Sequence, residues 1–329
     1  MNILVGVISP SAAWIMPRAF VEQIRCQFPQ HTVLEAWDQE TIRRLLPQAD
    51  IAFTPYVDRD IFPGLTRLRW IQAPAAGIGH LLYPEMLASG VLLTSAGGIR
   101  ARSIAEHVLG ASIALARQFP LTLRHQAKHE WIQHQLEGGG MSTIRTLRGA
   151  HMGIVGLGAI GLEVARLATP FGFRVSAIRR RATGPRPDGV EELLTPDALP
   201  ALLADSDVLV LCAPLTPETR ALIGRREVAQ MKRGALLINV GRGKLIVDEA
   251  VVEGLESGQL GGAALDVFTR EPLDPASPYW DLPNVIITPH TSGAMEDYYT
   301  PLVALFSENL RRFEQGQPLL NIVDKAAGY

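Results

Sequence analysis

The amino-acid sequence predicts an α/β protein built from two doubly wound, parallel-sheet domains. The chain has 329 residues, too many for one ordinary core and suited to two domains of roughly 150 residues each. Short apolar runs alternate with longer amphipathic stretches along nearly the whole chain, which is typical of parallel βαβ units. A glycine-rich segment at residues 156–161 lies directly between an apolar run and a helix pattern, as at the first turn of a nucleotide-binding sheet.

Composition narrows the class of protein. With 47% hydrophobic residues, 19% charged residues and a net charge of -2, the chain is expected to be soluble and globular, with no basic face for nucleic acid. The two cysteines, Cys26 and Cys212, exclude a disulfide framework and favour a reducing compartment. The first residues lack the pattern of a signal peptide, and no stretch of about 18 apolar residues occurs. We therefore expect a cytoplasmic protein with no membrane partner.

The elements of the first hundred residues predict a small doubly wound unit. The run at residues 3–7 is expected to be the first strand, and residues 18–28, just after Pro17, the first helix. Further strands are expected at residues 51–53, 68–72 and 92–95.

The middle of the chain predicts a connection between the domains. Apolar positions recur at helical spacing over residues 103–117, and a second helix is expected over residues 122–134, after Pro120. The triplet Gly138-Gly139-Gly140 predicts an exposed loop, because three glycines cost too much backbone entropy inside a helix or strand.

The second half predicts a larger sheet. Its expected strands are residues 152–155, 173–178, 208–211, 235–239, 262–266 and 285–288, and a terminal helix is expected from about residue 295 to 313. The segment Gly156-Leu157-Gly158-Ala159-Ile160-Gly161 follows the first of these strands and precedes a helix. The first glycine makes the tight turn, the second lets a pyrophosphate approach, and the third permits close helix packing. Such turns also occur for steric reasons alone, but the complete strand, helix and strand context favours dinucleotide binding.

Five segments occur in a characteristic order: residues 75–80, 103–107, 156–161, 239–243 and 266–290, the last running from Asp266 through Glu271 to His290. In this order they resemble the D-isomer-specific 2-hydroxyacid dehydrogenase family over essentially the full chain. The resemblance implies a Rossmann cofactor domain, residues 99–291, inserted into a flavodoxin-like substrate domain of residues 1–98 and 292–329. It also implies a homodimer, with a dimerisation segment at about residues 118–148.

The resemblance further implies the residues that bind the cofactor. Asp266 would accept a hydrogen bond from the nicotinamide carboxamide, although an acid at the end of a strand can also simply form a turn. The pyrophosphate contacts would be Gly156, Gly158, Ala159 and Ile160. Cys212 and Pro214, at a strand end, would lie along the ribose and adenine, and the remaining expected contacts are Val240, Ser292 and Gly293.

Reduction of a 2-keto acid needs a cation for the carboxylate and carbonyl, and a proton donor for the developing alkoxide. Arg242 supplies a planar guanidinium, His290 an imidazole, and Glu271 the carboxylate that orients it. Taken singly, these residues could be a surface charge, a loop histidine and a solvated acid, but their joint order favours catalysis. Backbone N–H groups of Ala76 and Gly77 are expected to bind the substrate carboxylate.

Other polar residues receive no chemical role. His107 and Glu106 are expected to be structural residues of one helix, and no role is assigned to Trp131, His134, Tyr298 or Tyr299. No Cys/His cluster has the spacing of metal ligands, so no metal is predicted.

The sequence 179–181 reads Arg-Arg-Arg, where NAD-dependent members of the family carry an acidic residue that binds the adenine ribose. Arg179 lies 18 residues after Gly161, near the position where the ribose is read. A solvated turn is the alternative interpretation. We expect Arg179 and Arg180 to pair with a 2′-phosphate, and therefore NADP in preference to NAD.

The predicted activity is reduction of a small 2-keto acid, with glyoxylate or hydroxypyruvate as first candidates, or the reverse oxidation of a D-2-hydroxy acid. Two alternatives remain open. One is a dehydrogenase for another small anion, such as phosphoglycerate or phosphite. The other is a dinucleotide-sensing scaffold similar to the transcriptional corepressors that resemble this family.

Overall fold

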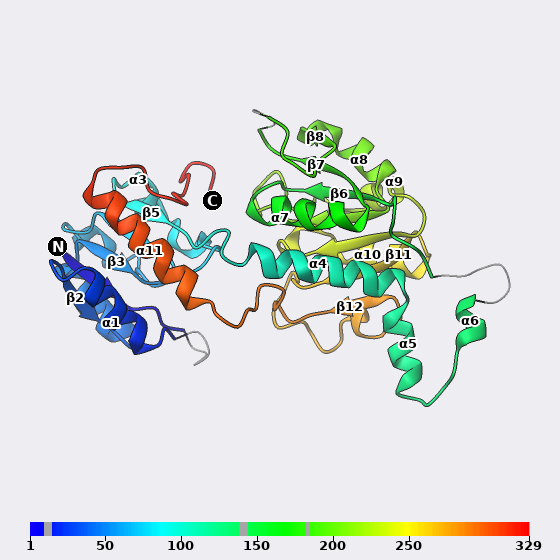
Figure 1. The fold of residues 1–329 in the computed structure, drawn as a ribbon, viewed down its shortest axis with the longest axis horizontal. Helices are drawn as coiled ribbons and strands as arrows, with labels where there is room; N and C mark the ends of the chain where they lie inside the picture. The colour runs from blue at the N-terminus through cyan, green and yellow to red at the C-terminus, as the bar shows by residue number, and fades with distance from the viewer. Residues whose placement is uncertain (10–14, 138–143, 182–184, 329) are drawn as a thin grey trace. The chain divides into compact units, whose positions relative to one another are not determined.

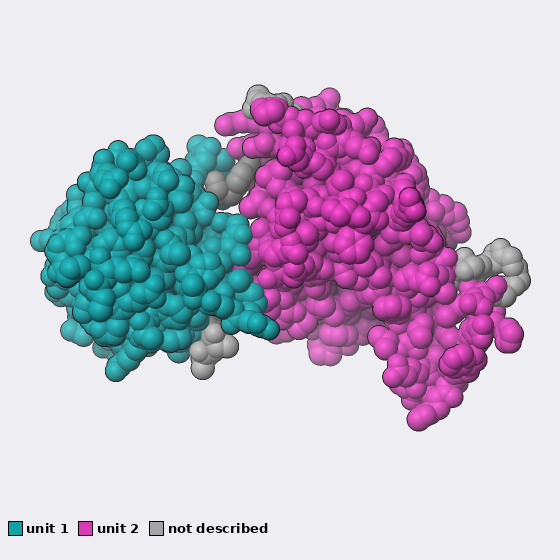
Figure 2. All heavy atoms as spheres, in the orientation of Figure 1, with its two compact units in different colours: residues 1–99, 295–329 teal, residues 100–294 magenta. Residues whose placement is uncertain are grey.

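The computed structural model describes residues 1–9, 15–137, 144–181 and 185–328. Its contacts divide the chain into unit 1, Met1–Ile99 with Met295–Tyr329, and unit 2, Arg100–Ala294 (Figure 2). Unit 2 is thus inserted, in sequence, between the two segments of unit 1. The loop predicted at Gly138-Gly139-Gly140 lies outside the described residues.

Unit 1 contains a five-stranded parallel sheet in the order β2-β1-β3-β4-β5 (Figure 1). The strands are β1 Asn2–Val5, β2 Thr32–Glu35, β3 Ile51–Phe53, β4 Trp70–Gln72 and β5 Leu92–Thr94. This strand order is the flavodoxin-like one.

Helices cover both faces of the unit 1 sheet, because alternate strand residues point to opposite faces. Helices α1 (Arg18–Gln27) and α11 (Tyr299–Glu314) lie side by side on one face (Figure 1). There the Phe306 ring stacks on Phe53 at 4.5 Å and on Trp70 at 5.4 Å between ring centroids. Arg311 of α11 also lies over the ring of Phe28, just after α1. Helices α2 (Gln39–Leu45) and α3 (Pro84–Ala88) cover the other face. The C-terminal helix is therefore part of the core of unit 1.

Unit 2 contains a seven-stranded parallel sheet in the order β12-β11-β10-β9-β6-β7-β8. The strands are β6 His151–Val155, β7 Arg174–Ile178, β8 Glu192–Leu194, β9 Val208–Leu211, β10 Ala235–Asn239, β11 Leu260–Leu265 and β12 Val285–Ile287. The order reverses at β6, as in a Rossmann sheet, whose ligands bind beyond the carboxyl ends of the strands at this point. The predicted fold class is confirmed.

Two layers of helices bury this sheet. Helices α4 (Ala101–Ala116) and α7 (Ala159–Ala168) pack together on one face, against side chains such as Ile154, Val210 and Ile238. The opposite face is covered by α8 (Leu199–Asp205), α9 (Arg225–Gln230) and α10 (Asp248–Glu256). Both faces are apolar, which explains why the central strands are continuous hydrophobic runs.

One predicted helix is wrong. Residues 122–134 form the end of α5 (Phe119–Gln126) and the start of α6 (Gln133–Glu137), with non-helical backbone between them. His129 adopts a φ of 57°, which a continuous right-handed helix does not allow. Among the described residues, no helix is both long and apolar enough to cross a membrane.

Candidate active site

The glycine segment forms a tight loop at the carboxyl end of β6. Gly156 has a φ of +101°, and a Cβ atom there would lie 2.6 Å from the backbone nitrogen of Ala213. A Cβ on Gly161 would lie 2.3 Å from the carbonyl oxygen of Gly156. A Cβ on Gly158 would meet nothing within 4 Å, so this side of the loop is open. Only glycine therefore fits the two closed positions, and the open one gives a ligand access to the backbone.

The loop residues fit a dinucleotide pyrophosphate. Gly158 is the N-cap of α7 and has no side chain that could cap the helix. The first N–H groups of this ten-residue helix, which starts at Ala159 and Ile160, can therefore donate to an anion beside Gly158. These are the positions where the predicted pyrophosphate contacts lie.

The loops after β7 and β9 flank the glycine loop. The backbone N–H groups of Gly156 and Leu157 donate to the carbonyl of Ile178, at 3.0 and 3.2 Å, and the N–H of Cys212 donates to Val155 at 2.8 Å. Arg179 and Arg180 follow Ile178 directly and have exposed side chains. The Thr216 hydroxyl and, to a smaller extent, the charge of Arg180 lower the pKa of Glu218 in the loop after β9. The predicted adenosine contacts Cys212 and Pro214 thus lie on one side of β6 and the arginines on the other.

Arg242 lies in a loop whose path is fixed by its neighbours. The Asn239 side chain, at the end of β10, accepts from the N–H of Gly241 at 3.1 Å and donates to the carbonyl of Arg242 at 2.9 Å. A Cβ on Gly243 would lie 1.9 Å from the carbonyl carbon of Phe268, so the loop passes directly against the backbone after β11. The exposed Arg242 guanidinium is therefore held near the segment that carries Glu271.

Glu271 and His290 form a hydrogen-bonded pair. His290 Nδ1 lies 2.7 Å from Glu271 Oε2, with side chains 54% and 37% exposed. The other oxygen of Glu271 accepts from the N–H of Phe268 at 3.0 Å. The carboxylate thus fixes the imidazole through Nδ1 and leaves Nε2 as the atom that can exchange a proton with a substrate.

Asp266 anchors the loop that carries His290. Its carboxylate is buried and accepts from the Thr288 hydroxyl at 2.6 Å, from the N–H of Thr291 at 2.8 Å, and from both the N–H and the hydroxyl of Ser292. Its backbone carbonyl accepts from the N–H of His290 at 2.9 Å. His290 itself adopts a φ of 56°, a conformation that surrounding contacts must hold. The predicted carboxamide contact of Asp266 would compete with these donors.

The remaining predicted positions are placed as follows. Val240 is buried, and its N–H donates to the Leu211 carbonyl. Ser292 is buried, and a Cβ on Gly293 would lie 3.0 Å from Arg100 Cδ at the start of α4. Ala76 and Gly77 are exposed residues of unit 1.

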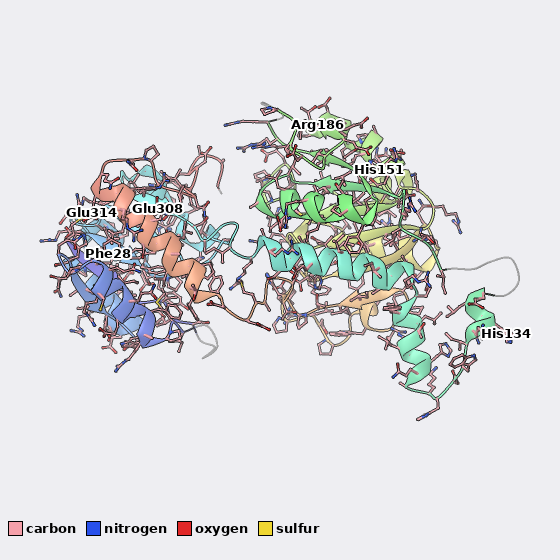
Figure 3. All side chains as sticks on the ribbon, viewed as in Figure 1. Phe28, His134, His151, Arg186, Glu308 and Glu314 are labelled. Atoms are coloured by element: carbon pink, nitrogen blue, oxygen red, sulfur yellow. The ribbon has the colours of Figure 1, made fainter. Side chains whose placement is uncertain are left out.

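The residues without an assigned role differ in their surroundings. Tyr298 is buried in unit 1, and its hydroxyl donates to the Pro74 carbonyl. Trp131 is 88% exposed, and His134 lies on α6 (Figure 3). In the part of the chain that the structure describes, no three His, Cys, Asp or Glu side chains gather as metal ligands would.

Sequence reasoning missed Asn239, Gly243 and the anchoring role of Asp266. The only local signal for the first two was a pair of glycines around Arg242, which indicates close backbone approach. The partners of Asp266 are more than twenty residues away in the chain, so no local pattern identifies them.

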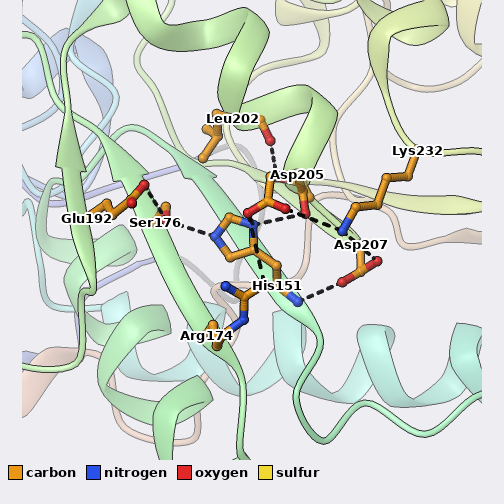
Figure 4. A network of polar contacts seen from close by, with 9 residues as sticks. His151, Arg174, Ser176, Glu192, Leu202, Asp205, Asp207 and Lys232 are labelled. Carbon is orange, nitrogen blue, oxygen red and sulfur yellow. Dashed lines mark hydrogen bonds and ion pairs between the residues drawn. The ribbon is translucent and has the colours of Figure 1, made fainter.

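A second polar network surrounds His151, at the end of β6 opposite to the glycine loop (Figure 4). His151 Nε2 lies 2.8 Å from Ser176 Oγ, and Nδ1 lies 2.9 Å from Asp205 Oδ2. This spacing is similar to a hydrolase triad, but His151 is buried and begins β6, at the opposite end of the strand from Gly156. The network therefore joins β6, β7 and α8 and is not part of the candidate site.

Comparisons with known proteins identify the family of the chain. The family model for the NAD-binding domain of D-isomer specific 2-hydroxyacid dehydrogenases matches residues 109–292. A glyoxylate reductase of Aeropyrum pernix is 32% identical over 331 residues, covering 94% of this chain and 96% of that protein. Glyoxylate/hydroxypyruvate reductase B of Pectobacterium carotovorum is 34% identical over 275 residues, covering 82% of each.

Solved structures give the same result. An NADPH-dependent glyoxylate/hydroxypyruvate reductase of Sinorhizobium meliloti, in complex with NADP and sulfate, has a TM-score of 0.81 and 30% sequence identity, and covers 100% of this chain and 99% of that one. The fold and these relatives define an NAD(P)-dependent oxidoreductase. The chain belongs to the D-isomer-specific 2-hydroxyacid dehydrogenase family, which confirms the resemblance inferred from the sequence.

Proposed function

We propose that the protein reduces a small 2-keto acid to the D-2-hydroxy acid, or catalyses the reverse oxidation, with NADP or NAD as cofactor. The observation that supports this most directly is the Glu271–His290 pair at 2.7 Å, beside the loop of Arg242. The cofactor supplies or accepts the hydride at the second carbon of the substrate. The side chains then need to bind the carboxylate, polarise the carbonyl and move one proton.

His290 is the proposed general acid for reduction. With Nδ1 held by Glu271, the Nε2–H of the protonated ring donates to the carbonyl oxygen as negative charge develops there. In the reverse direction, neutral Nε2 accepts the hydroxyl proton. Replacing His290 with Ala should lower kcat by about 10²- to 10⁴-fold while NADPH affinity stays within about twofold of the wild type. Wild-type kcat in this variant would exclude His290 as the acid.

Arg242 is the proposed cation for the substrate carboxylate and carbonyl. Its guanidinium can bind both oxygens of a carboxylate, which a point charge cannot. Ala76 and Gly77, on the exposed loop of unit 1 after β4, stay predicted backbone contacts of the substrate carboxylate.

The substrate is best tested with a panel of keto acids. Relatives named glyoxylate reductase and glyoxylate/hydroxypyruvate reductase favour glyoxylate and hydroxypyruvate. Oxidation of NADPH and NADH would be followed with these two acids, pyruvate and bulkier keto acids, and the reverse reaction with 3-phosphoglycerate and phosphite. Turnover with phosphoglycerate or phosphite alone would identify the alternative dehydrogenase. Dinucleotide binding with no turnover would support the scaffold.

Arg179 and Arg180 are proposed to favour NADP over NAD. They follow β7, which adjoins the glycine-loop strand β6, and guanidinium groups there can pair with a 2′-phosphate. Arg179→Asp should lower the ratio of kcat/KM for NADPH to that for NADH by one to two powers of ten, since each charge-assisted bond contributes about 1.5 to 3 kcal/mol. Arg174→Asp, at the other end of the same strand, is the matched control. Equal use of NADH by the wild type would exclude the preference.

A homodimer is proposed through α5 and α6. Phe119 and Leu123 on α5 are 49% and 60% exposed, and Trp131 lies between the two helices. Apolar side chains gathered on one projecting segment are typical of an interface. Sedimentation of the wild type and of a Leu123→Glu variant tests the dimer, and a monomeric wild type would exclude it. Cytoplasmic localisation stays a prediction from the sequence.

A further inference from the structure

The loop after β4 holds the two residues of unit 1 that the proposed reaction uses. It runs from Ala73 to Gly77, and its last two residues are exposed. Among the described residues, none accepts a hydrogen bond from the backbone N–H groups of Ala75, Ala76 or Gly77. Successive N–H groups without a protein acceptor can bind an anion together. This loop is therefore suited to the substrate carboxylate only if these groups face it.

The carbonyl groups of the same loop are held from the core side. The Tyr298 hydroxyl donates to the carbonyl of Pro74, and the N–H of Ala96 donates to the carbonyl of Ala75 at 3.1 Å. Pro74, Ala96 and Tyr298 are all buried. Both carbonyls therefore point into the core of unit 1, where each has a donor.

The direction of each carbonyl sets the direction of the N–H group that follows it. In a trans peptide unit these two groups point to opposite sides of the chain, and the peptide bonds of this loop are trans. Because the Pro74 carbonyl points into the core, the N–H of Ala75 points away from it. The Ala75 carbonyl fixes the N–H of Ala76 in the same way. The loop thus turns N–H groups, and not carbonyl oxygens, away from the core.

Tyr298 is itself fixed at the start of α11. It is the N-cap residue of this helix, and its ring lies 5.7 Å from the ring of Tyr299, between centroids. The Asp297 side chain accepts from the N–H of Thr300 at 3.0 Å, which holds the first turn of the helix. Tyr298 comes 224 positions after Pro74 in the chain. The shape of the loop after β4 therefore depends on how α11 packs in unit 1.

We propose that Tyr298 is a positioning residue for the substrate, because its hydroxyl holds the Pro74 carbonyl in the core and so keeps the N–H groups of the loop turned to the substrate carboxylate. This inference rests on the proposed function and adds to it a residue that acts through the loop. Without the hydroxyl, the buried Pro74 carbonyl loses its donor, which favours rotation of the peptide unit between Pro74 and Ala75. Such a rotation would present an oxygen to the carboxylate in place of an N–H group, and two negative groups repel each other.

Tyr298→Phe tests the assignment, because it removes the hydroxyl and keeps the ring. KM and kcat would be measured for the best keto acid at saturating NADPH, and the dissociation constant of NADPH by calorimetry. Tyr83→Phe is the matched control. The Tyr83 hydroxyl also donates to a backbone carbonyl of unit 1, at 3.2 Å, but that carbonyl belongs to Val57, in the loop after β3.

We expect Tyr298→Phe to raise the KM for the keto acid about tenfold, since one hydrogen bond shifts an equilibrium by about a power of ten. Its kcat should stay within about twofold of the wild type, because the carboxylate is bound equally in the ground and transition states. NADPH affinity should also stay within about twofold, and Tyr83→Phe should match the wild type in all three quantities.

A KM for Tyr298→Phe within about twofold of the wild type would overturn the inference while the proposed function stands. Equal losses of keto acid and NADPH affinity would also overturn it, because they would show that Tyr298 only maintains the fold. An equal rise of KM in Tyr83→Phe would have the same meaning. Wild-type protein that reduces no keto acid would instead refute the proposed function, and this inference with it.

Discussion

Replacing Glu271 with Gln tests whether the carboxylate assists His290 by its charge. The wild-type carboxylate accepts two hydrogen bonds at once, from His290 Nδ1 at 2.7 Å and from the N–H of Phe268 at 3.0 Å. A glutamine side chain has one oxygen and one NH₂ group. The protonated imidazole and the Phe268 amide donate to different oxygens of Glu271, Oε2 and Oε1, so a glutamine in the same position has an oxygen for only one of them. The variant therefore loses one hydrogen bond, and only when His290 is protonated.

The size of this loss follows from the exposure of the pair. A hydrogen bond to a charged group contributes about 1.5 to 3 kcal/mol when desolvated. The two side chains are 54% and 37% exposed, so solvent screening reduces the effect to about 1 kcal/mol. At about 1.4 kcal/mol per tenfold change, this loss lowers kcat/KM for reduction about fivefold above neutral pH, so the alkaline fall of the profile begins at lower pH.

The assay is the pH dependence of kcat/KM for NADPH oxidation with the best keto acid. Asp274→Asn is the control, because Asp274 is an exposed carboxylate of the same loop whose charged partner is Arg270. Its profile should match the wild type. A Glu271→Gln profile that also matches would show that the charge of Glu271 is not coupled to the proton of His290.

Three further outcomes are expected. Arg242→Lys should lower kcat/KM for the best keto acid at least tenfold, because lysine cannot bind a carboxylate at two points; an unchanged value would remove Arg242 from the site. Gly156→Ala should lower the free energy of unfolding, measured in urea, by about 2 kcal/mol or more, since it combines a positive φ with a backbone clash. Gly149→Ala, with a φ of +81° and nothing within 4 Å, should cost only about 1 kcal/mol, and equal losses would contradict the clash. Iodoacetamide at pH 8 should modify the exposed Cys26 but leave Cys212 intact until the protein unfolds, because burial raises the pKa of the Cys212 thiol to about 12; mass spectrometry distinguishes the two sites.

The sequence predicts every strand that has neighbours on both sides, and also the apolar edge strands β5 (Leu92–Thr94) and β12 (Val285–Ile287). Central strands such as β9 (Val208–Leu211) are buried throughout and form continuous apolar runs. The two strands that were not predicted, β2 (Thr32–Glu35) and β8 (Glu192–Leu194), lie at sheet edges. Each carries a glutamate and lacks fully buried positions. An edge strand with polar residues is specified by pairing with its neighbour, which a local hydrophobic pattern does not record.

The features of the candidate site also fall into two groups: those that the sequence shows directly and those that depend on how distant segments pack. Glycine positions and the order of Arg242, Glu271 and His290 are visible in the sequence, because turn geometry and charge belong to single residues. The partners of Asp266 are set by how the segments after β11 and β12 pack, so no local pattern in the sequence identifies them. Only the folded unit shows which acceptors are occupied.

The strand order of unit 2 arranges the proposed chemistry along one edge of the sheet. Every site residue follows a strand: His290 follows β12, Asp266 β11, Arg242 β10, Cys212 β9, Gly156 β6 and Arg179 β7. In the order β12-β11-β10-β9-β6-β7, five spacings of about 4.8 Å separate the first strand from the last, or roughly 24 Å. At that distance solvent screens the charge of Arg179 from the proton of His290. Arg179→Asp should therefore change the KM for NADPH and leave kcat at saturating cofactor within about twofold. A parallel fall in kcat would show that the two ends of the sheet are coupled.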